Sequence, residues 1–279
     1  MAKNTDSSIK LLVLYDILLK STDEEHALST NKIIGYVIGN GFDLSHGMKT
    51  KYTDFYEYLK TNDSKNLEAF DYFYNVYDLW GNFEDNIGKI DYKLFMSHMG
   101  SIYDGKSDKS EIRGDINSED VDFDHIICNY EELIEDLKNW IETVELLQRK
   151  YVLSDKDIYL SFNYTSLLEN VYSIDCAKIL HIHGSVKDGD LILGYNNICV
   201  EKVLEDADCG IYTWEFPYEE LGYELLSEYM CCFHKDTDAI IHRNVKFFKQ
   251  LERVDELLIL GISFSKTDIK YLDYIVLYL

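Results

Sequence analysis

The feature that most constrains this chain is a continuous apolar run that closes on two nearby glycines. The run covers Ile33–Ile38, and the segment Gly-Asn-Gly-Phe-Asp follows it at positions 39–43. An apolar run of this length without polar alternation is typical of a strand buried on both faces. The next segment, KYTDFYEYLK at 51–60, carries its apolar residues at helical spacing. These residues predict a buried strand, a tight glycine turn and a helix, the opening of an α/β fold.

The same alternation returns after residue 155. Short apolar runs predict strands at IYLSF (158–162), KILHI (178–182), LILGY (191–195) and ELLIL (256–260), with helices at 166–172 and 267–279. Ser166 and Glu169 have capping-box spacing for the first of these helices, and Thr267 is placed to cap the second. Because strands that alternate with helices pair in parallel, we predict an α/β fold with a Rossmann-type, largely parallel sheet.

The rest of the chain reads mainly as helix. We predict a helical insertion from about residue 67 to residue 150 within an α/β domain that spans 31–279, with an acidic loop at 100–124. Helical spacing also predicts an N-terminal helical extension over residues 1–30. The single proline, Pro217, lies in the segment WEFPYEE, which we predict to be irregular.

Charge and cysteine content narrow the function classes. The chain has 27 basic and 51 acidic residues and a formal net charge of −24, which disfavours binding to a phosphate backbone. Its six cysteines form no C-x-x-C pair, so a disulfide framework and a four-thiolate zinc site are both disfavoured. No apolar run reaches the ~18 residues of a membrane span, and no export signal is evident. We expect a cytoplasmic protein that binds neither nucleic acid nor a membrane.

Polar and glycine residues follow each strand of the recurring unit. In an open parallel sheet, ligands bind outside the carboxyl ends of the strands, so these residues are expected to converge on one crevice. They are Gly39, Gly41, Asn163, Tyr164, Thr165, His183, Gly184, Gly261 and Ser263. A glycine pair before a helix suits a phosphate site, although Leu44 stands where a dinucleotide fingerprint has its third glycine. A tight turn without a ligand is the alternative.

Two histidines lie near the end of the KILHI run. His181 and His183 are two positions apart and are expected to share a strand face. Such a pair can ligate a metal ion, but no third ligand follows at a suitable spacing, so we expect no metal site. His183 is either a ligand contact at the strand end or a histidine at the edge of the core.

Five ordered blocks carry a family resemblance. They are IIGYVIGNGFDLSHGMKTKYTDFYEYLK, LWGNFEDNI, SFNYTSLLENVY, HIHGSVKDGDLILGY and LLILGISFSKTDIKYLDYI. Together they resemble the AbiH family of bacterial abortive-infection proteins over about residues 31–279. More distantly, GNGFD, FNYT and IHG resemble motifs of sirtuin-like NAD-binding domains, in which a histidine and an asparagine act on the nicotinamide ribose. The resemblance implies phage defence, with NAD or a related nucleotide as ligand or substrate.

The resemblance also assigns residues to roles. It implies nucleotide contacts for Gly39, Asn40, Gly41, Phe42, Asp43, Tyr164, Gly184, Gly261, Ser263 and Asp268, and catalysis for Asn163 and His183. Asn163 would hold the ribose or the attacking water, and His183 would act as a general base at the ribose hydroxyls. Asp43 departs from the small hydroxyl residue usual in sirtuin-like turns, and a carboxylate beside a pyrophosphate is unfavourable unless it points away. Glu84 is a second candidate carboxylate, or else a solvated helix residue.

Three functions are compared, and the first two follow from these assignments. Hydrolysis of the nicotinamide–ribose bond passes through an oxocarbenium-like state and needs an oriented ribose and a polar group at the attacking oxygen. The alternative is a non-catalytic nucleotide sensor that triggers defence through a phage or host protein, and a homo-oligomer is left open. A nuclease ranks third, because no clustered acidic metal motif is present.

The N-terminal segment carries a separate resemblance. Residues 9–37 resemble the first two helices of the winged helix found ahead of WYL-type transcriptional regulators. The second of those helices would use the residues that we predict as the first strand, and the net charge disfavours DNA. We therefore favour a helical extension packed on the α/β domain.

Overall fold

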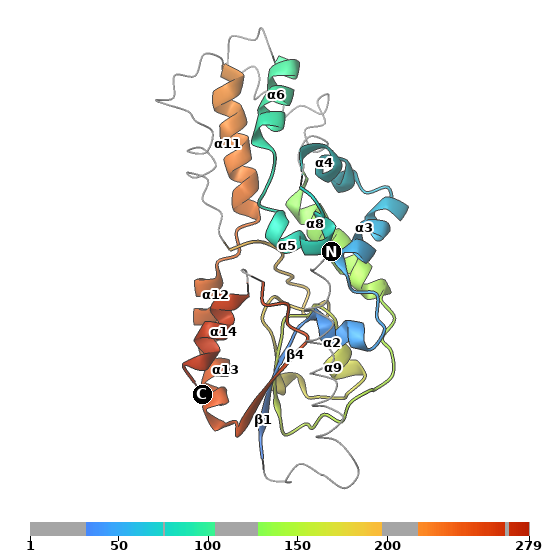
Figure 1. Cartoon of the computed structure of the whole chain (residues 1–279), viewed down its shortest axis with the longest axis vertical. Coiled ribbons are helices and arrows are strands. Elements are labelled where there is room, and N and C mark those ends of the chain that lie inside the picture. The colour runs from blue at the N-terminus through green and yellow to red at the C-terminus, as the bar shows by residue number, and fades with distance from the viewer. Residues whose placement is uncertain (1–31, 75, 104–127, 197–216, 266–267, 279) are drawn as a thin grey trace, which may run out of the picture. The chain divides into compact units, whose positions relative to one another are not determined.

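The computed structural model describes residues 32–74, 76–103, 128–196, 217–265 and 268–278 (Figure 1). These residues divide into two compact units: an α/β unit from the segments 32–51, 138–192 and 237–278, and a helical unit from the segments 52–137 and 193–236. The predicted N-terminal extension, the winged-helix resemblance before residue 32 and the proposed cap at Thr267 lie outside the described residues.

The α/β unit contains a four-stranded parallel sheet. Its strands are β1 (Ile34–Ile38), β2 (Ile158–Ser161), β3 (Ile179–His181) and β4 (Glu256–Leu260), in the order β3-β2-β1-β4. All three strand pairings are parallel. The two inner strands are buried along their whole length, as expected of continuous apolar runs, whereas the outer two are partly exposed. The predicted α/β fold with a Rossmann-type parallel sheet is confirmed.

Helices cover both faces of the sheet (Figure 1). On one face, Tyr36 stacks on Tyr159 with ring centroids 5.0 Å apart, and helices α2 (Asn40–Ser45) and α9 (Leu167–Asn170) complete that half of the core. On the other face, Val37 and its neighbours pack against residues of α12 (Thr237–Arg243), α13 (Val245–Phe248), η4 (Lys249–Arg253) and α14 (Ile269–Val276). A short 3-10 helix, η3 (Cys176–Lys178), precedes β3.

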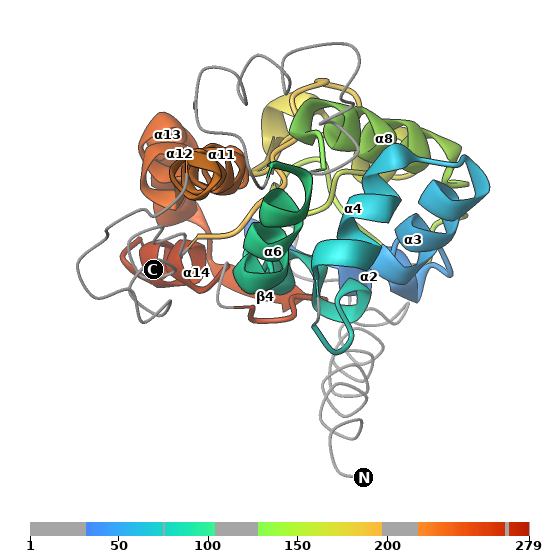
Figure 2. The same cartoon turned by 90° about the horizontal axis from the view of Figure 1, so that it is seen from above.

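The helical unit is built from short amphipathic elements. They are α3 (Tyr52–Thr61), α4 (Lys65–Phe73), η1 (Trp80–Asn82), α5 (Phe83–Asn86), α6 (Tyr92–Tyr103) and α11 (Pro217–Cys232), and α8 (Tyr130–Thr143) has residues in both units. Seen from above, α3 and α4 are neighbours (Figure 2). Fully buried phenylalanines belong to the core of this unit, which explains the aromatic-rich sequence: Phe55, Phe70, Phe83 and Phe95.

Two predicted segments take a different form. The segment LILGY is not a strand: Tyr195 forms an isolated bridge with His234, and the N–H of Ile192 donates to the carbonyl of His183. Pro217 does not lie in irregular chain, because it is the first residue of α11. Proline suits that position, since its fixed φ is helical and no intrahelical partner waits for an N–H there.

Candidate functional site

The glycine turn after β1 lies against the turn after β4. The N–H of Gly39 donates to the carbonyl of Leu260 over 2.8 Å, and that of Gly41 donates to Gly261 over 2.9 Å. Gly261 has a φ of +68°, and a Cβ there would lie 2.3 Å from the nitrogen of Phe42. The chain adds β2 and β3 on one side of β1 and then β4 on the other side. The turns after β1 and β4 therefore meet at the topological switch point of the sheet. Glycine is therefore required at Gly41 and Gly261 by backbone contact alone.

The polar atoms of this turn are engaged within the chain. Besides Gly39 and Gly41, Phe42 donates its N–H to the carbonyl of Gly39 over 2.9 Å. The amide of Asn40 is held at both ends, because its Nδ2 donates to the carbonyl of Thr50 and its Oδ1 accepts from the Thr50 hydroxyl. A nucleotide phosphate that used these donors would have to replace those hydrogen bonds.

A buried carboxyl lies next to the turn. Asp43 is 1% exposed, and its two oxygens accept hydrogen bonds from Asn163 Nδ2 over 2.8 Å and from Thr165 Oγ1 over 2.7 Å. The same Nδ2 donates to the carbonyl of Gly39 over 3.2 Å. Burial raises the pKa of Asp43 to about 6, although the two hydrogen bonds favour its charged form. Asp43 thus points into a polar contact between the ends of β1 and β2.

A histidine–glutamate pair extends this contact toward β3. His181 donates from Nδ1 to the carbonyl of Asn163 over 2.8 Å, and its Nε2 lies 3.2 Å from Glu169 Oε1. The two side chains are only 5% and 8% exposed. The other oxygen of Glu169 is buried and has no hydrogen-bond partner among the described residues. We call Asp43, Asn163, Thr165, His181 and Glu169 the strand-end cluster.

The pair shifts the pKa of each member in the direction that favours its charged form. Burial lowers the pKa of His181, but the hydrogen bonds to Glu169 and Asn163 and the charge of Glu169 outweigh it, so the net shift is upward. Burial raises the pKa of Glu169, yet its bond to His181 brings the net pKa below the usual value. Because both partners of the ring are acceptors, the doubly protonated imidazolium satisfies both.

His183 lies apart from His181. It is 2% exposed, its ring centroid is 5.4 Å from those of Phe162 and Tyr271, and its Nε2 lies 3.3 Å from the Tyr271 hydroxyl. The expectation that the two histidines share a strand face is wrong, because β3 ends at His181 and the chain turns there, with Gly184 N–H donating to the His181 carbonyl. His181 contacts α9 and His183 contacts α14.

A match to a family model decides the family of this chain. The model described as bacteriophage abortive infection AbiH matches residues 36–278. The chain belongs to the AbiH family. No curated protein and no solved structure was found to match it. The matched range contains the whole strand-end cluster.

The remaining predicted contacts of this AbiH-family chain are dispersed. Tyr164 donates its hydroxyl to the carbonyl of Ile192 over 2.9 Å, and Ser263 is exposed. Asp268 occupies the N-cap position of α14 and accepts from the Ser265 hydroxyl over 2.9 Å. Of the polar side chains that were predicted to converge, Asn163 and Thr165 are joined to Asp43 directly by hydrogen bonds.

Glycine at 184 and the ring at 42 have structural explanations. Gly184 has a φ of +82°, and a Cβ there would lie 1.8 Å from the carbonyl oxygen of Asp190. Phe42 is buried in the core, with its ring centroid 4.7 Å from that of His46 and 5.4 Å from that of Tyr151. Backbone packing therefore accounts for Gly184, and core packing accounts for Phe42.

Two residues that contact the predicted histidines, Glu169 and Tyr271, were missed by sequence reasoning. Glu169 was expected in a capping box with Ser166, but Ser166 makes no side-chain cap and its Oγ accepts from Asn170 over 2.8 Å. Tyr271 carried no signal beyond helical spacing. A strand-end histidine and a glutamate twelve positions earlier have no recognisable spacing, so only the fold could join them.

Glu84 belongs to another polar contact, inside the helical unit. Its carboxylate accepts from Lys235 Nζ over 2.8 Å and from the hydroxyl of Tyr52. The Lys235 side chain is 0% exposed and that of Glu84 22%, so Glu84 is not the solvated residue of the simpler expectation. Removing one partner of such a pair leaves a buried charge.

Neither a metal cluster nor a membrane span is found in the described part of this AbiH-family chain. Among those residues no group of three or more His, Cys, Asp or Glu side chains is arranged to hold a metal ion. None of the described helices is both long enough and apolar enough to cross a bilayer.

Proposed function

We propose that this AbiH-family protein acts in abortive infection by binding NAD or a related nucleotide at the carboxyl ends of β1 and β2 and hydrolysing its nicotinamide–ribose bond. The observation that carries the proposal is the carboxyl of Asp43, which is 1% exposed, held by Asn163 and Thr165, and has a pKa of about 6. Perturbed carboxyls at strand ends of α/β sheets are typical of functional sites.

The proposed chemistry uses the charge of Asp43. At neutral pH a carboxyl with a pKa of about 6 is mostly ionised. Because water is excluded around it, its electrostatic interaction with a nearby positive charge is stronger than in solution. Such a charge stabilises an oxocarbenium-like ribose or accepts a proton from the attacking water. Asn163 orients the carboxylate through its Nδ2. His183 keeps its proposed role at the ribose hydroxyls, although its contacts are with Phe162 and Tyr271.

Nicotinamide release from NAD tests the proposal. We expect turnover by the wild type and a loss of roughly 10²–10⁴-fold in Asp43→Asn, the range of general acid–base catalysis. Asn163→Ala and His183→Gln test the other two roles. The matched control is Asp157→Asn, because Asp157 is also a buried carboxyl of the α/β unit but holds the N–H of Ile34 at the amino end of β1.

Two results would contradict the proposal. Equal loss of nicotinamide release in Asp43→Asn and Asp157→Asn would contradict the catalytic role of Asp43, because it would show that only stability had changed. Absence of nicotinamide release with NAD binding still measurable by calorimetry would favour the second candidate, a non-catalytic nucleotide sensor that acts through a phage or host protein or through a homo-oligomer.

Burial of the site favours that second candidate in one respect. Asp43, Asn163 and His183 are each 8% exposed or less. A nucleotide that reaches them must move neighbouring groups, so binding would be coupled to a change of conformation, as a trigger requires. Light scattering with and without NAD would detect a coupled change in oligomeric state.

A further inference from the structure

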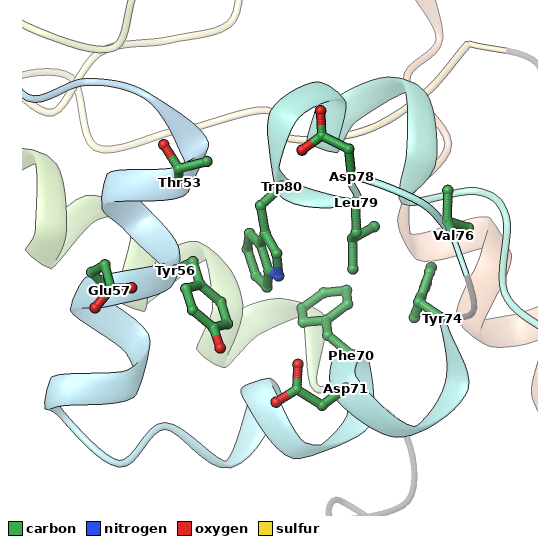
Figure 3. A pocket seen from close by; sticks show the side chains of 10 residues that line it. All are labelled: Thr53, Tyr56, Glu57, Phe70, Asp71, Tyr74, Val76, Asp78, Leu79 and Trp80. Atoms are coloured by element: carbon green, nitrogen blue, oxygen red, sulfur yellow. The ribbon is translucent and has the colours of Figure 1, made fainter.

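The helical unit contains a cavity whose chemistry differs from that of the strand-end cluster. Its volume is about 450 Å³, within the usual range for small-ligand sites. Two kinds of side chain dominate its lining (Figure 3): the aromatic rings of Tyr56, Phe70 and Trp80, and the carboxylates of Glu57, Asp71 and Asp78. Among the described residues that line this cavity, none is basic.

The aromatic wall is held in place by its own contacts. Trp80 stacks on Phe83 with centroids 4.6 Å apart and an interplanar angle of 7°. Tyr56 lies 5.3 Å and Phe70 5.4 Å from the Trp80 ring. Tyr56 and Trp80 are half-buried, so part of each ring remains accessible from the cavity, where Figure 3 shows them side by side. The faces of such rings attract cations.

The carboxylates lie at the accessible rim. Glu57, Asp71 and Asp78 are all exposed, and Asp78 is oriented by the N–H of Gly81 over 3.1 Å. Burial raises the pKa of Asp71, and the charge of Lys60 opposes that effect. The Nζ of Lys60 also lies 5.9 Å from the centroid of the Tyr56 ring. A cation of the chain itself therefore already approaches this aromatic and acidic wall.

We propose that this cavity binds the guanidinium group of an arginine side chain presented by a partner polypeptide. A guanidinium is planar, stacks on aromatic rings and pairs with carboxylates through two parallel hydrogen bonds, whereas an ammonium is a compact point charge. The exposed rim admits a side chain carried by a second chain. The net charge of −24 attracts basic partners over a longer range. This inference is independent of the nucleotide proposal.

Calorimetry with a short peptide tests the inference. The probe is acetyl-Gly-Arg-Gly-amide, and its matched control replaces arginine by citrulline, which is neutral and nearly the same shape. We expect the arginine peptide to bind at least roughly tenfold more tightly, the effect of about 1.4 kcal/mol. Asp71→Asn and Glu57→Gln should each weaken it roughly three- to tenfold, and Tyr56→Leu should do so as well.

The control variant removes a charge elsewhere. Glu142→Gln removes an exposed carboxylate of α8 that does not line the cavity, so it should leave the affinity unchanged. Equal binding of the two peptides, no binding to the wild type, or an equal effect of Glu142→Gln would overturn the inference. Methylguanidinium binding as tightly as the peptide would overturn the polypeptide partner in favour of a small ligand. Because Asp71 and Glu57 are exposed, their variants are expected to fold.

Discussion

Asp43 shows how a single buried side chain links pH to stability. Its pKa is raised from 3.8 to about 6, so the folded protein holds this proton more tightly than the unfolded chain does. The stabilisation is complete below about pH 4 and is lost as the pH rises through about 6. That difference corresponds to on the order of 3 kcal/mol.

We predict that Asp43→Asn removes this pH dependence. The free energy of unfolding of the wild type should fall relative to that of the variant between about pH 4 and pH 7, because only the wild type loses a proton there. Urea unfolding followed by circular dichroism at several pH values measures the difference. Parallel pH profiles for the two proteins would show that Asp43 has an ordinary pKa.

A second prediction at this scale concerns His181. The charge of Glu169 raises the pKa of the ring against the effect of burial, so Glu169→Gln should lower that pKa. The stabilisation from the protonated ring is complete below the ordinary value of 6.5 and is lost as the pH rises through the higher folded pKa. NMR titration of the imidazole, assigned with His181→Gln, measures the shift. An unchanged pKa of His181 in Glu169→Gln would show that the two side chains do not form an ion pair.

Among the elements, the turns after β1 and β4 approach each other too closely for a side chain at Gly41 or Gly261. Gly261→Ala should cost several kcal/mol, because a Cβ there would lie 2.3 Å from the nitrogen of Phe42 and the φ of +68° is unfavourable. Gly189→Ala is the matched control: its φ is +86°, but nothing lies within 4 Å of an added Cβ, so only about 1–2 kcal/mol of strain is expected. Equal losses in thermal unfolding would show that conformation, not contact, requires glycine at 261.

For the whole molecule, the net charge of −24 makes opposite predictions for the two proposed ligands. An anionic nucleotide is repelled by the protein, so its affinity should rise from low to moderate salt as the repulsion is screened. An arginine peptide is attracted, so its affinity should fall over the same range. Calorimetry at about 0.01 M and 0.15 M NaCl, where the Debye length is about 30 Å and 8 Å, measures both. A steep loss of NAD affinity with salt would count against the proposed nucleotide site.

Local patterns in the sequence were enough for the central sheet. The runs at Ile33–Ile38 and 158–162 predict strands within one residue of β1 and β2, because a strand buried on both faces needs uninterrupted apolar side chains. The segment LILGY was harder to predict: its composition is typical of a strand, but within the described part of the chain it forms only the isolated bridge of Tyr195. An apolar run joins a sheet only where the fold places another strand beside it to accept its backbone hydrogen bonds.

The candidate site likewise has features that the sequence predicts and contacts that only the structure shows. Local sequence patterns predict the four strands, the glycine turn and the polar residues that follow each strand, since these depend on neighbours in the chain. Only the tertiary structure decided that the glycines contact each other, that Asp43 holds Asn163, and that His181 pairs with Glu169 while His183 joins Tyr271. Those contacts join residues that are far apart in sequence, and their energies come from burial and approach in space, which no local pattern records.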